Sequence, residues 1–150
     1  MDKKNKILIE KNLEAKKGFS HAKCHLRYHI IFVTKYRRKC LEPIRDIIFA
    51  GFKLCESKSH FKIHNMNIDN DHIHLLIEIH PKYSISQTVE RMKQMTLNHV
   101  YRECNDYMRQ FYWTKKRRLW TSGYFVSTVG KVSEDIVFNY INNQGIEYYE

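Results

Sequence analysis

The chain has 150 residues, of which 26 are Lys or Arg and 16 are Asp or Glu, so its formal net charge is +10. This length predicts one domain, and a content of 43% hydrophobic and 13% aromatic residues excludes a disordered or fibrous chain. No apolar run approaches the roughly 20 residues of a membrane span. The four cysteines include no C-x-x-C pair, which favours free thiols in a reducing cytoplasm. The positive net charge favours nucleic acid as the partner.

The first half of the chain predicts a strand, a helix and a hairpin after a basic N-terminal arm. Residues 1–23 are rich in lysine and form the predicted arm, so the folded domain spans residues 24–150. Residues 26–34 are largely apolar and predict a central strand covered on both faces. Pro43 begins a helix whose apolar positions recur at helical spacing up to Cys55. Residues 61–68 and 72–80 predict two strands joined by a turn at residues 69–71.

The second half predicts a helix, a strand and a last helix. Ser84 is expected to cap a helix that ends near Glu103, and residues 124–129 predict a short strand. Ser133 is expected to cap the last helix, which is expected to end before Gly145. The order β-α-β-β-α-β-α begins with the split βαβ arrangement. We therefore predict an α+β fold: a ferredoxin-like βαββαβ antiparallel sheet with helices on one face, its first and third strands central, and an additional C-terminal helix.

Two histidines stand out on the third predicted strand. Side chains two residues apart on a strand point to the same face, so His72 and His74 project together while Ile73 faces the other way. Two imidazoles on one face can bind one divalent metal ion. The alternative is a pair of ordinary surface or core histidines in a chain that has nine.

A second pair of candidates lies on the last predicted helix. Tyr140 and Gln144 are four residues apart and so lie one turn apart on the same side. A tyrosine can act as a nucleophile, and a glutamine carbonyl can complete a metal site beside two histidines. The pair also flanks the apolar positions Val137 and Ile141, where a tyrosine is usually a packed side chain.

Four motifs follow one another along the chain: Lys35-Tyr36-Arg37-Arg38, Asp71–Ile77, Trp120–Gly130 and Tyr140-Ile141-x-x-Gln144. With these motifs, residues 24–144 closely resemble the single-tyrosine HUH transposases of the IS200/IS605 insertion-sequence family, named for His, a hydrophobic residue and His. The basic arm is longer than the family pattern, and the chain ends soon after the last helix.

The resemblance implies a DNA strand transferase that acts on single-stranded DNA, with element ends that fold as imperfect hairpins. In such enzymes a divalent ion, Mg²⁺ or Mn²⁺, sits on the two histidines and the helix glutamine, here His72, His74 and Gln144. The helix tyrosine, here Tyr140, attacks the scissile phosphate and yields a 5′-phosphotyrosine and a free 3′-OH. The family is dimeric, which implies a homodimer whose composite active sites join the histidines of one subunit to the tyrosine helix of the other.

The chemistry of these residues adds two expectations. Two histidines and a glutamine carry no charge, so the metal ion should bind weakly until a DNA phosphate supplies an anionic ligand. A phosphotyrosine bond keeps the energy of the broken phosphodiester, and the chain lacks a Gly-rich phosphate loop, so no nucleotide cofactor is expected.

Two basic runs are the candidate DNA contacts, and nearby aromatic side chains could stack on unpaired bases. The alternative is that the basic side chains are only solvated and the aromatic ones belong to the core. The basic residues are Lys35, Arg37, Arg38, Lys39, Lys115, Lys116, Arg117 and Arg118, and the aromatic ones are Tyr36, Tyr112, Trp113 and Trp120.

Three other functions fit parts of the pattern. A non-catalytic nucleic-acid-binding module can use the same sheet, although it would display aromatic side chains on the central strands where this chain has histidines. A domesticated relative would nick DNA for a host function. A metal hydrolase would use His72 and His74 with water as the nucleophile.

Overall fold

A computed structural model of the chain describes residues 26–129 and 139–143. Its strands are β1 (Arg27–Val33), β2 (Phe61–Ile68), β3 (His72–Ile79) and β4 (Phe125–Thr128), and its helices are α2 (Arg45–Ser57) and α3 (Ile85–Phe111). Two short 3-10 turns, η2 (Lys35–Arg37) and η3 (Glu42–Ile44), follow β1, and residues 139–143 are helical. The proposed arm, residues 1–23, lies outside the described residues.

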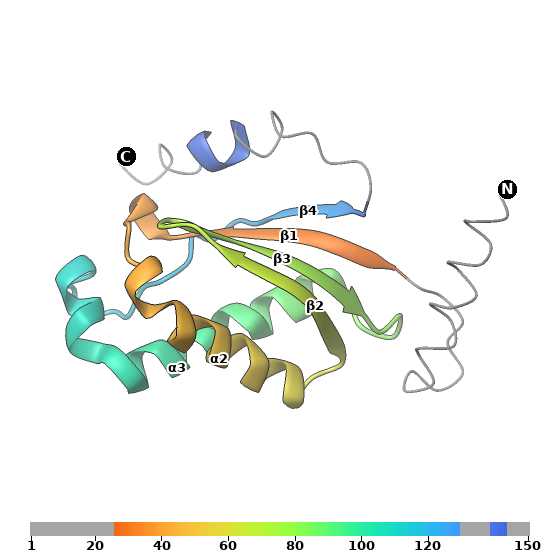
Figure 1. Ribbon diagram of the computed structural model, residues 1–150, viewed down its shortest axis with the longest axis horizontal. Helices are drawn as coiled ribbons and strands as arrows, with labels where there is room; N and C mark the ends of the chain where they lie inside the picture. Colours follow the sequence, from red (N-terminus) through yellow and green to blue (C-terminus); the bar gives the residue numbers. More distant parts are fainter. Residues whose placement is uncertain (1–25, 130–138, 144–150) are drawn as a thin grey trace, which may run out of the picture.

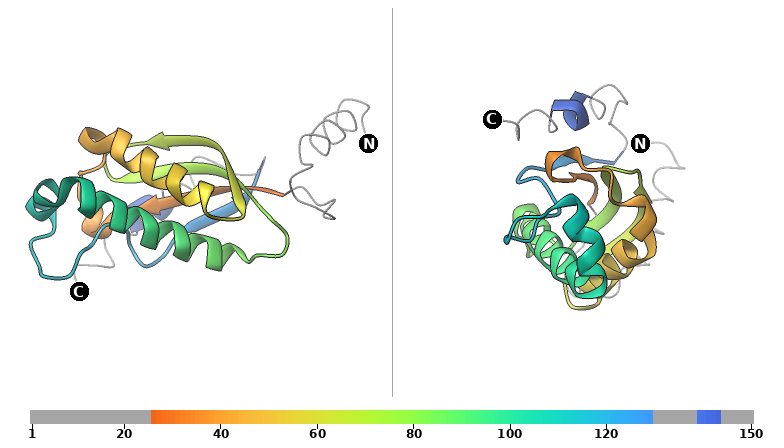
Figure 2. Two further views of the ribbon diagram at one scale, coloured as in Figure 1. Left: turned by 90° about the horizontal axis from the view of Figure 1, so that it is seen from below. Right: turned by 90° about the vertical axis from the view of Figure 1, so that its left-hand side faces the viewer.

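The four strands form one antiparallel sheet in the order β2-β3-β1-β4. This order confirms the predicted ferredoxin-like sheet with the first and third strands at its centre. Helices α2 and α3 lie side by side on one face of the sheet, and residues 139–143 lie on the opposite face (Figures 1 and 2). The sheet therefore separates a helix-covered core from the face that carries the candidate site.

Strand β1 is buried on both sides, as its continuous apolar run predicts. Ile30 and Phe32 belong to the core under α2 and α3, whereas Ile31 and Val33 pack with Ile141 on the other face. All four of these strand side chains are at most 1% exposed. A strand covered on both faces is a rigid support for the site, because β1 cannot move without disrupting the packed side chains on one face or the other.

Helix α3 is longer than predicted. Ser84 caps the helix as expected, and it forms a capping box with Gln87. The helix runs on past Glu103 to Phe111, with a kink at Cys104, where the backbone is non-helical. The second part buries Met108 in the core, and the hydroxyl of Tyr107 donates a 2.8 Å hydrogen bond to the Cys40 carbonyl. The polar sequence after Cys104 did not predict this part of the helix, because long-range contacts rather than a local pattern stabilise it.

A buried hydrogen bond under the sheet gives a stability prediction. The Trp120 indole N–H donates to the Thr96 hydroxyl over 2.9 Å, and both side chains lie in the core. Replacing Thr96 with Val keeps the shape but leaves the indole N–H without an acceptor, so we expect a loss of about 1–3 kcal/mol in the free energy of unfolding. Urea denaturation measures this loss, and Thr96→Ser is the control that keeps the acceptor. Equal stability of the Val and Ser variants would contradict the prediction.

Across residues 26–129 and 139–143, helices long and apolar enough to cross a membrane are absent.

Candidate active site

As predicted, His72 and His74 project together from strand β3. The structure shows that the face they share is the one away from α2 and α3. Ile73 and Leu75 point the other way, into the helix-covered core. The two imidazole rings lie 4.9 Å apart between centroids and meet edge to face. Opposite them on β1 are Val33, paired with His72, and Ile31, paired with His74.

A third possible ligand, Asp69, was missed by the sequence analysis. Potential ligand atoms of Asp69, His72 and His74 all lie within 4.8 Å of one another. The Asp69 carboxylate is 3.1 Å from His72 Nε2. Asp69 belongs to the turn between β2 and β3, and its N–H bonds to the His72 carbonyl across that turn. A tight hairpin brings residue i beside residue i+3. The spacing of Asp69 and His72 is therefore the sequence signal that could have identified Asp69 as a candidate ligand.

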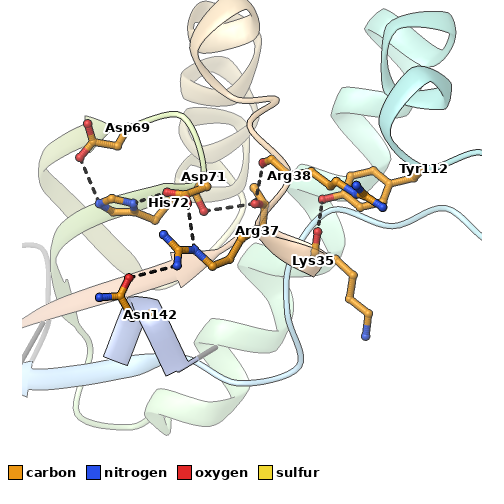
Figure 3. Close-up of polar contacts among 9 residues, drawn as sticks. Lys35, Arg37, Arg38, Asp69, Asp71, His72, Tyr112 and Asn142 are labelled. Carbon is orange, nitrogen blue, oxygen red and sulfur yellow. Dashed lines mark hydrogen bonds and ion pairs between the residues drawn. The ribbon is translucent and has the colours of Figure 1, made fainter. Parts of the chain in front are cut away.

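Asp71 supports His72 from behind (Figure 3). His72 Nδ1 lies 2.8 Å from Asp71 Oδ1, and Arg37 Nε donates to Asp71 Oδ2 over 3.1 Å. Burial opposes ionisation of Asp71, but the hydrogen bonds from His72 and Arg37 outweigh it and hold the pKa of this carboxyl below its ordinary value. An ionised Asp71 fixes the imidazole so that Nε2 is directed to Asp69, an arrangement typical of metal-binding histidines.

The surroundings of His74 favour its neutral form. Burial lowers the pKa of its imidazole, and the neighbouring His72 lowers it further. Neutral imidazole is the form that binds a metal ion. The group of two imidazoles and one carboxylate therefore suits a divalent ion of the Mg²⁺ to Mn²⁺ type, with the imidazoles favouring Mn²⁺.

The segment 139–143 brings Tyr140 onto the same face. Ile141 packs against Ile31 and Val33, the β1 residues that face the histidines. Tyr140 is half-buried, with its ring 5.6 Å from that of Phe125 on β4. Asn142 accepts a 3.0 Å hydrogen bond from Arg37 Nη1. The predicted metal ligand Gln144 lies outside the described residues.

Part of the predicted DNA surface gathers in one groove. A groove of about 530 Å³ lies between α3 and residues 116–124, and its basic lining residues are Lys35, Lys93, Lys116, Arg117 and Arg118. Burial lowers the pKa of Lys93 to about 8, and its ammonium donates to the carbonyls of Thr121 and Gly123. Of the other predicted contacts, Lys39 and Lys115 are exposed, and Arg37 is bonded within the site.

The structure corrects the prediction for two aromatic side chains. Tyr112 and Trp120 are 3% and 9% exposed, so neither can stack on a base. Trp120 packs against Phe32 and Phe52 in the core. Trp113 is 70% exposed, and the Arg38 guanidinium lies 5.2 Å from its ring and 5.7 Å from the ring of Tyr36. Trp113 and Tyr36, with Arg38 between them, remain as possible stacking groups.

Comparison with known proteins identifies the chain's family. Residues 22–144 match the family model described as "Transposase IS200 like". The chain belongs to the IS200-like transposase family. It is 35% identical over 130 residues to the transposase for insertion sequence element IS200 of Salmonella typhimurium, which covers 85% of this chain and 82% of that protein. It is 25% identical over 137 residues to the ISDra2 transposase TnpA of Deinococcus radiodurans, covering 88% and 92% of the two chains.

Solved structures support the same fold for this IS200-like transposase. A crystal structure of a protein assigned as a transposase from Deinococcus radiodurans superposes with a TM-score of 0.74 at 25% identity, covering 86% of this chain and 97% of that one. A REP-associated tyrosine transposase bound to a REP hairpin superposes with a TM-score of 0.52 at 11% identity, covering 82% and 69%. The second likeness concerns the fold alone.

Proposed function

We propose that this transposase cleaves and rejoins single-stranded DNA at insertion-sequence ends through a 5′-phosphotyrosine on Tyr140. The observation that carries this proposal is the packing of residues 139–143 over β1, on the sheet face where His72 and His74 project. That packing puts a tyrosine and a group of potential metal ligands on one surface of one domain. Family membership supports the reaction class, because transposases cut and join DNA.

The proposed cleavage is a transesterification at phosphorus. The Tyr140 oxygen loses its proton and attacks the scissile phosphorus, a bond forms between them, and the bond from phosphorus to the 3′ oxygen breaks. The 3′ oxygen gains a proton and leaves as a 3′-OH. A phenol is a better leaving group than an alkyl alcohol, so a 3′-OH can later reverse the step and join a new end. The reaction therefore needs no nucleotide cofactor.

The proposed metal ligands are His72, His74, Asp69 and the predicted Gln144. A divalent ion bound there would polarise the phosphate and stabilise charge on the leaving oxygen. The chain's own contribution is orientation by Asp71, which fixes the His72 ring, together with burial that favours the neutral form of the His74 imidazole by lowering its pKa. Asp69 adds a negative charge to a ligand set that was expected to be neutral, although its side chain is 69% exposed.

Single-stranded DNA with hairpin ends is the proposed partner, and a cytoplasmic location fits that partner. The groove lined by Lys35 and Lys116–Arg118 joins two basic runs that are far apart in the sequence. Clustered cations of this kind bind the phosphate backbone with salt-dependent affinity. The structural neighbour bound to a REP hairpin supports a hairpin ligand on this fold.

Exposed Trp113 gives a DNA-binding prediction. Because stacking on one base is worth about 1–3 kcal/mol, Trp113→Ala should weaken binding of single-stranded DNA by that amount. Trp113→Tyr keeps an aromatic face and should bind nearly as wild type. Fluorescence anisotropy at fixed salt concentration measures both variants. Wild-type affinity of the Ala variant would remove Trp113 from the DNA surface.

We further propose a homodimer with composite active sites. In the described structure, residues 139–143 pack on the sheet of their own chain, and the composite arrangement requires the partner's segment to make these contacts instead. Mixing a His72→Ala chain with a Tyr140→Phe chain should then restore cleavage, because one site can combine an intact histidine set with an intact tyrosine. Cleavage no greater than that of the separate variants would contradict the composite site and favour the arrangement within one chain.

The proposed function is tested by incubation with single-stranded element ends and Mn²⁺, followed by a denaturing gel. A tyrosine nucleophile should produce a protein band shifted by covalently attached DNA. A metal hydrolase that uses water would cut the DNA without any such band, and a non-catalytic binding module would leave the DNA intact.

A further inference from the structure

Arg37 joins three parts of the fold that meet at the candidate active site. Its Nε donates to Asp71 Oδ2 over 3.1 Å, and its Nη1 donates to Asn142 Oδ1 over 3.0 Å. Asp71 in turn holds His72 through the 2.8 Å contact at Nδ1 (Figure 3). One guanidinium therefore connects the turn after β1, the start of β3 and the helical segment that carries Tyr140.

The backbone around Arg37 is shaped for this contact. Tyr36 and Arg37 both have left-handed conformations, with φ of 59° and 52°. Such conformations are unfavourable for residues with a side chain and persist only where surrounding contacts enforce them. Here the Thr34 hydroxyl donates to the Arg38 carbonyl over 2.8 Å, and the Tyr112 hydroxyl donates to the Lys35 carbonyl over 2.7 Å. Buried side chains on both sides of the turn thus keep Arg37 directed to Asp71 and Asn142.

The contacts of Arg37 with Asp71 and Asn142, here called the Arg37 bridge, are suited to a rigid connection. Arg37 is about one-third exposed and Asp71 is about one-tenth exposed, so their ion pair is partly shielded from water. A guanidinium has a fixed planar geometry, so fixing Nε on Asp71 also fixes where Nη1 points. Asn142 lies two residues from Tyr140 in the same helical segment, and its position therefore determines that of the tyrosine.

We propose that Arg37 is a positioning residue that holds the Tyr140 segment against the histidine face by joining Asp71 to Asn142. This inference rests on the proposed function for the role of Tyr140. It assigns Arg37 to the interior of the active site, whereas the basic run to which it belongs suggested a DNA contact.

Hydrogen exchange of the full-length protein, without DNA or metal, tests the bridge itself. Arg37→Gln and Asn142→Ala should each speed amide exchange several-fold in a peptide that covers residues 139–143, and leave exchange in β1 and β3 unchanged. Asn142→Asp keeps an acceptor at the same place and should restore wild-type exchange. Arg45→Gln is the matched control, because it removes an exposed arginine whose contacts, with Glu42 and with the Phe49 ring, lie outside the candidate site. Unchanged exchange in residues 139–143 of both Arg37→Gln and Asn142→Ala would overturn the proposal.

Cleavage kinetics separate positioning from DNA contact. At saturating single-stranded DNA, Arg37→Gln should slow formation of the covalent adduct by about 100-fold, because small misplacements of a reacting group have effects of this size. DNA affinity should stay near wild type, and adding Asn142→Ala should slow the reaction little further, since both changes break one bridge. A loss of DNA affinity with a wild-type rate at saturation would make Arg37 a DNA contact and overturn the proposal.

The positioning role of Arg37 and the identity of the nucleophile are tested by different experiments. The exchange experiment uses neither metal nor DNA, so it tests the bridge whatever residue is the nucleophile. An adduct that still forms in Tyr140→Phe would refute the proposed function while leaving the exchange result valid. If Arg37→Gln does not fold, Asn142→Ala tests the same contact from the half-buried helical segment. The proposal then still requires faster amide exchange in residues 139–143 alone.

Discussion

Replacing Tyr140 with Phe is expected to abolish covalent attachment of DNA and to lower cleavage by about three orders of magnitude or more, because the hydroxyl is the proposed nucleophile. Binding of single-stranded DNA should stay near wild type, since the ring that packs 5.6 Å from Phe125 is retained. A denaturing gel measures the adduct, and fluorescence anisotropy measures binding.

Three other tyrosines, which pack with the helix-covered core, are weaker candidates for the nucleophile. The hydroxyls of Tyr101, Tyr107 and Tyr112 donate to backbone carbonyls within the fold. Burial raises the pKa of each of these three phenols, which disfavours the phenolate. Tyr107→Phe is a matched control that removes a hydroxyl elsewhere and should cleave normally. An adduct that persists in Tyr140→Phe would show that another residue attacks the phosphate.

Binding of Mn²⁺ is expected to be weak in the free protein and tighter when single-stranded DNA is present. The scissile phosphate would add an anionic oxygen to a site whose proposed protein ligands carry one negative charge, on Asp69. His74→Ala removes a ligand and should weaken binding by at least about tenfold, in line with losses seen even for outer contacts of metal sites. Calorimetric titration with and without DNA measures both effects.

The contribution of the Asp69 charge to Mn²⁺ binding can be tested without changing the size of the side chain. Asp69→Asn should weaken Mn²⁺ binding to the free protein more than to the DNA complex, because the phosphate then supplies the missing charge. Asp106→Asn removes an equal charge from the exposed surface of α3 and is the matched control. Equal Mn²⁺ affinity with and without DNA, or tight binding that survives His74→Ala, would place the metal ion elsewhere.

Short-range patterns predicted most of the sheet and part of the site. The alternation in β3 sets His72 and His74 apart from Ile73, and this spacing alone puts both imidazoles on one face. The apolar run of β1 likewise predicted a strand buried on both sides, which the packing of Ile31 and Ile30 in different clusters confirms. These features follow from side chains within a few residues of one another.

Features that depend on the geometry of the hairpin turn or on contacts between distant residues were missed. Asp69 is only three residues from His72, but its sequence pattern indicates a turn residue and the tight hairpin is what brings its carboxylate to the imidazole. Arg37 reads as one of several DNA-binding cations, because its bonds to Asp71 and Asn142 span 34 and 105 residues of sequence. Tyr112 and Trp120 were candidates for stacking on bases because they lie near basic residues in the sequence, yet tertiary packing buries both.

Mass spectrometry of the covalent adduct is the most direct test of the proposed mechanism. Wild-type protein is incubated with single-stranded element ends and Mn²⁺, digested with protease and nuclease, and the modified peptide is sequenced. The proposed mechanism predicts a 5′-linked nucleotide on Tyr140 and a free 3′-OH on the released strand. A nucleotide on any other residue, or cleaved DNA without a modified peptide, would contradict it.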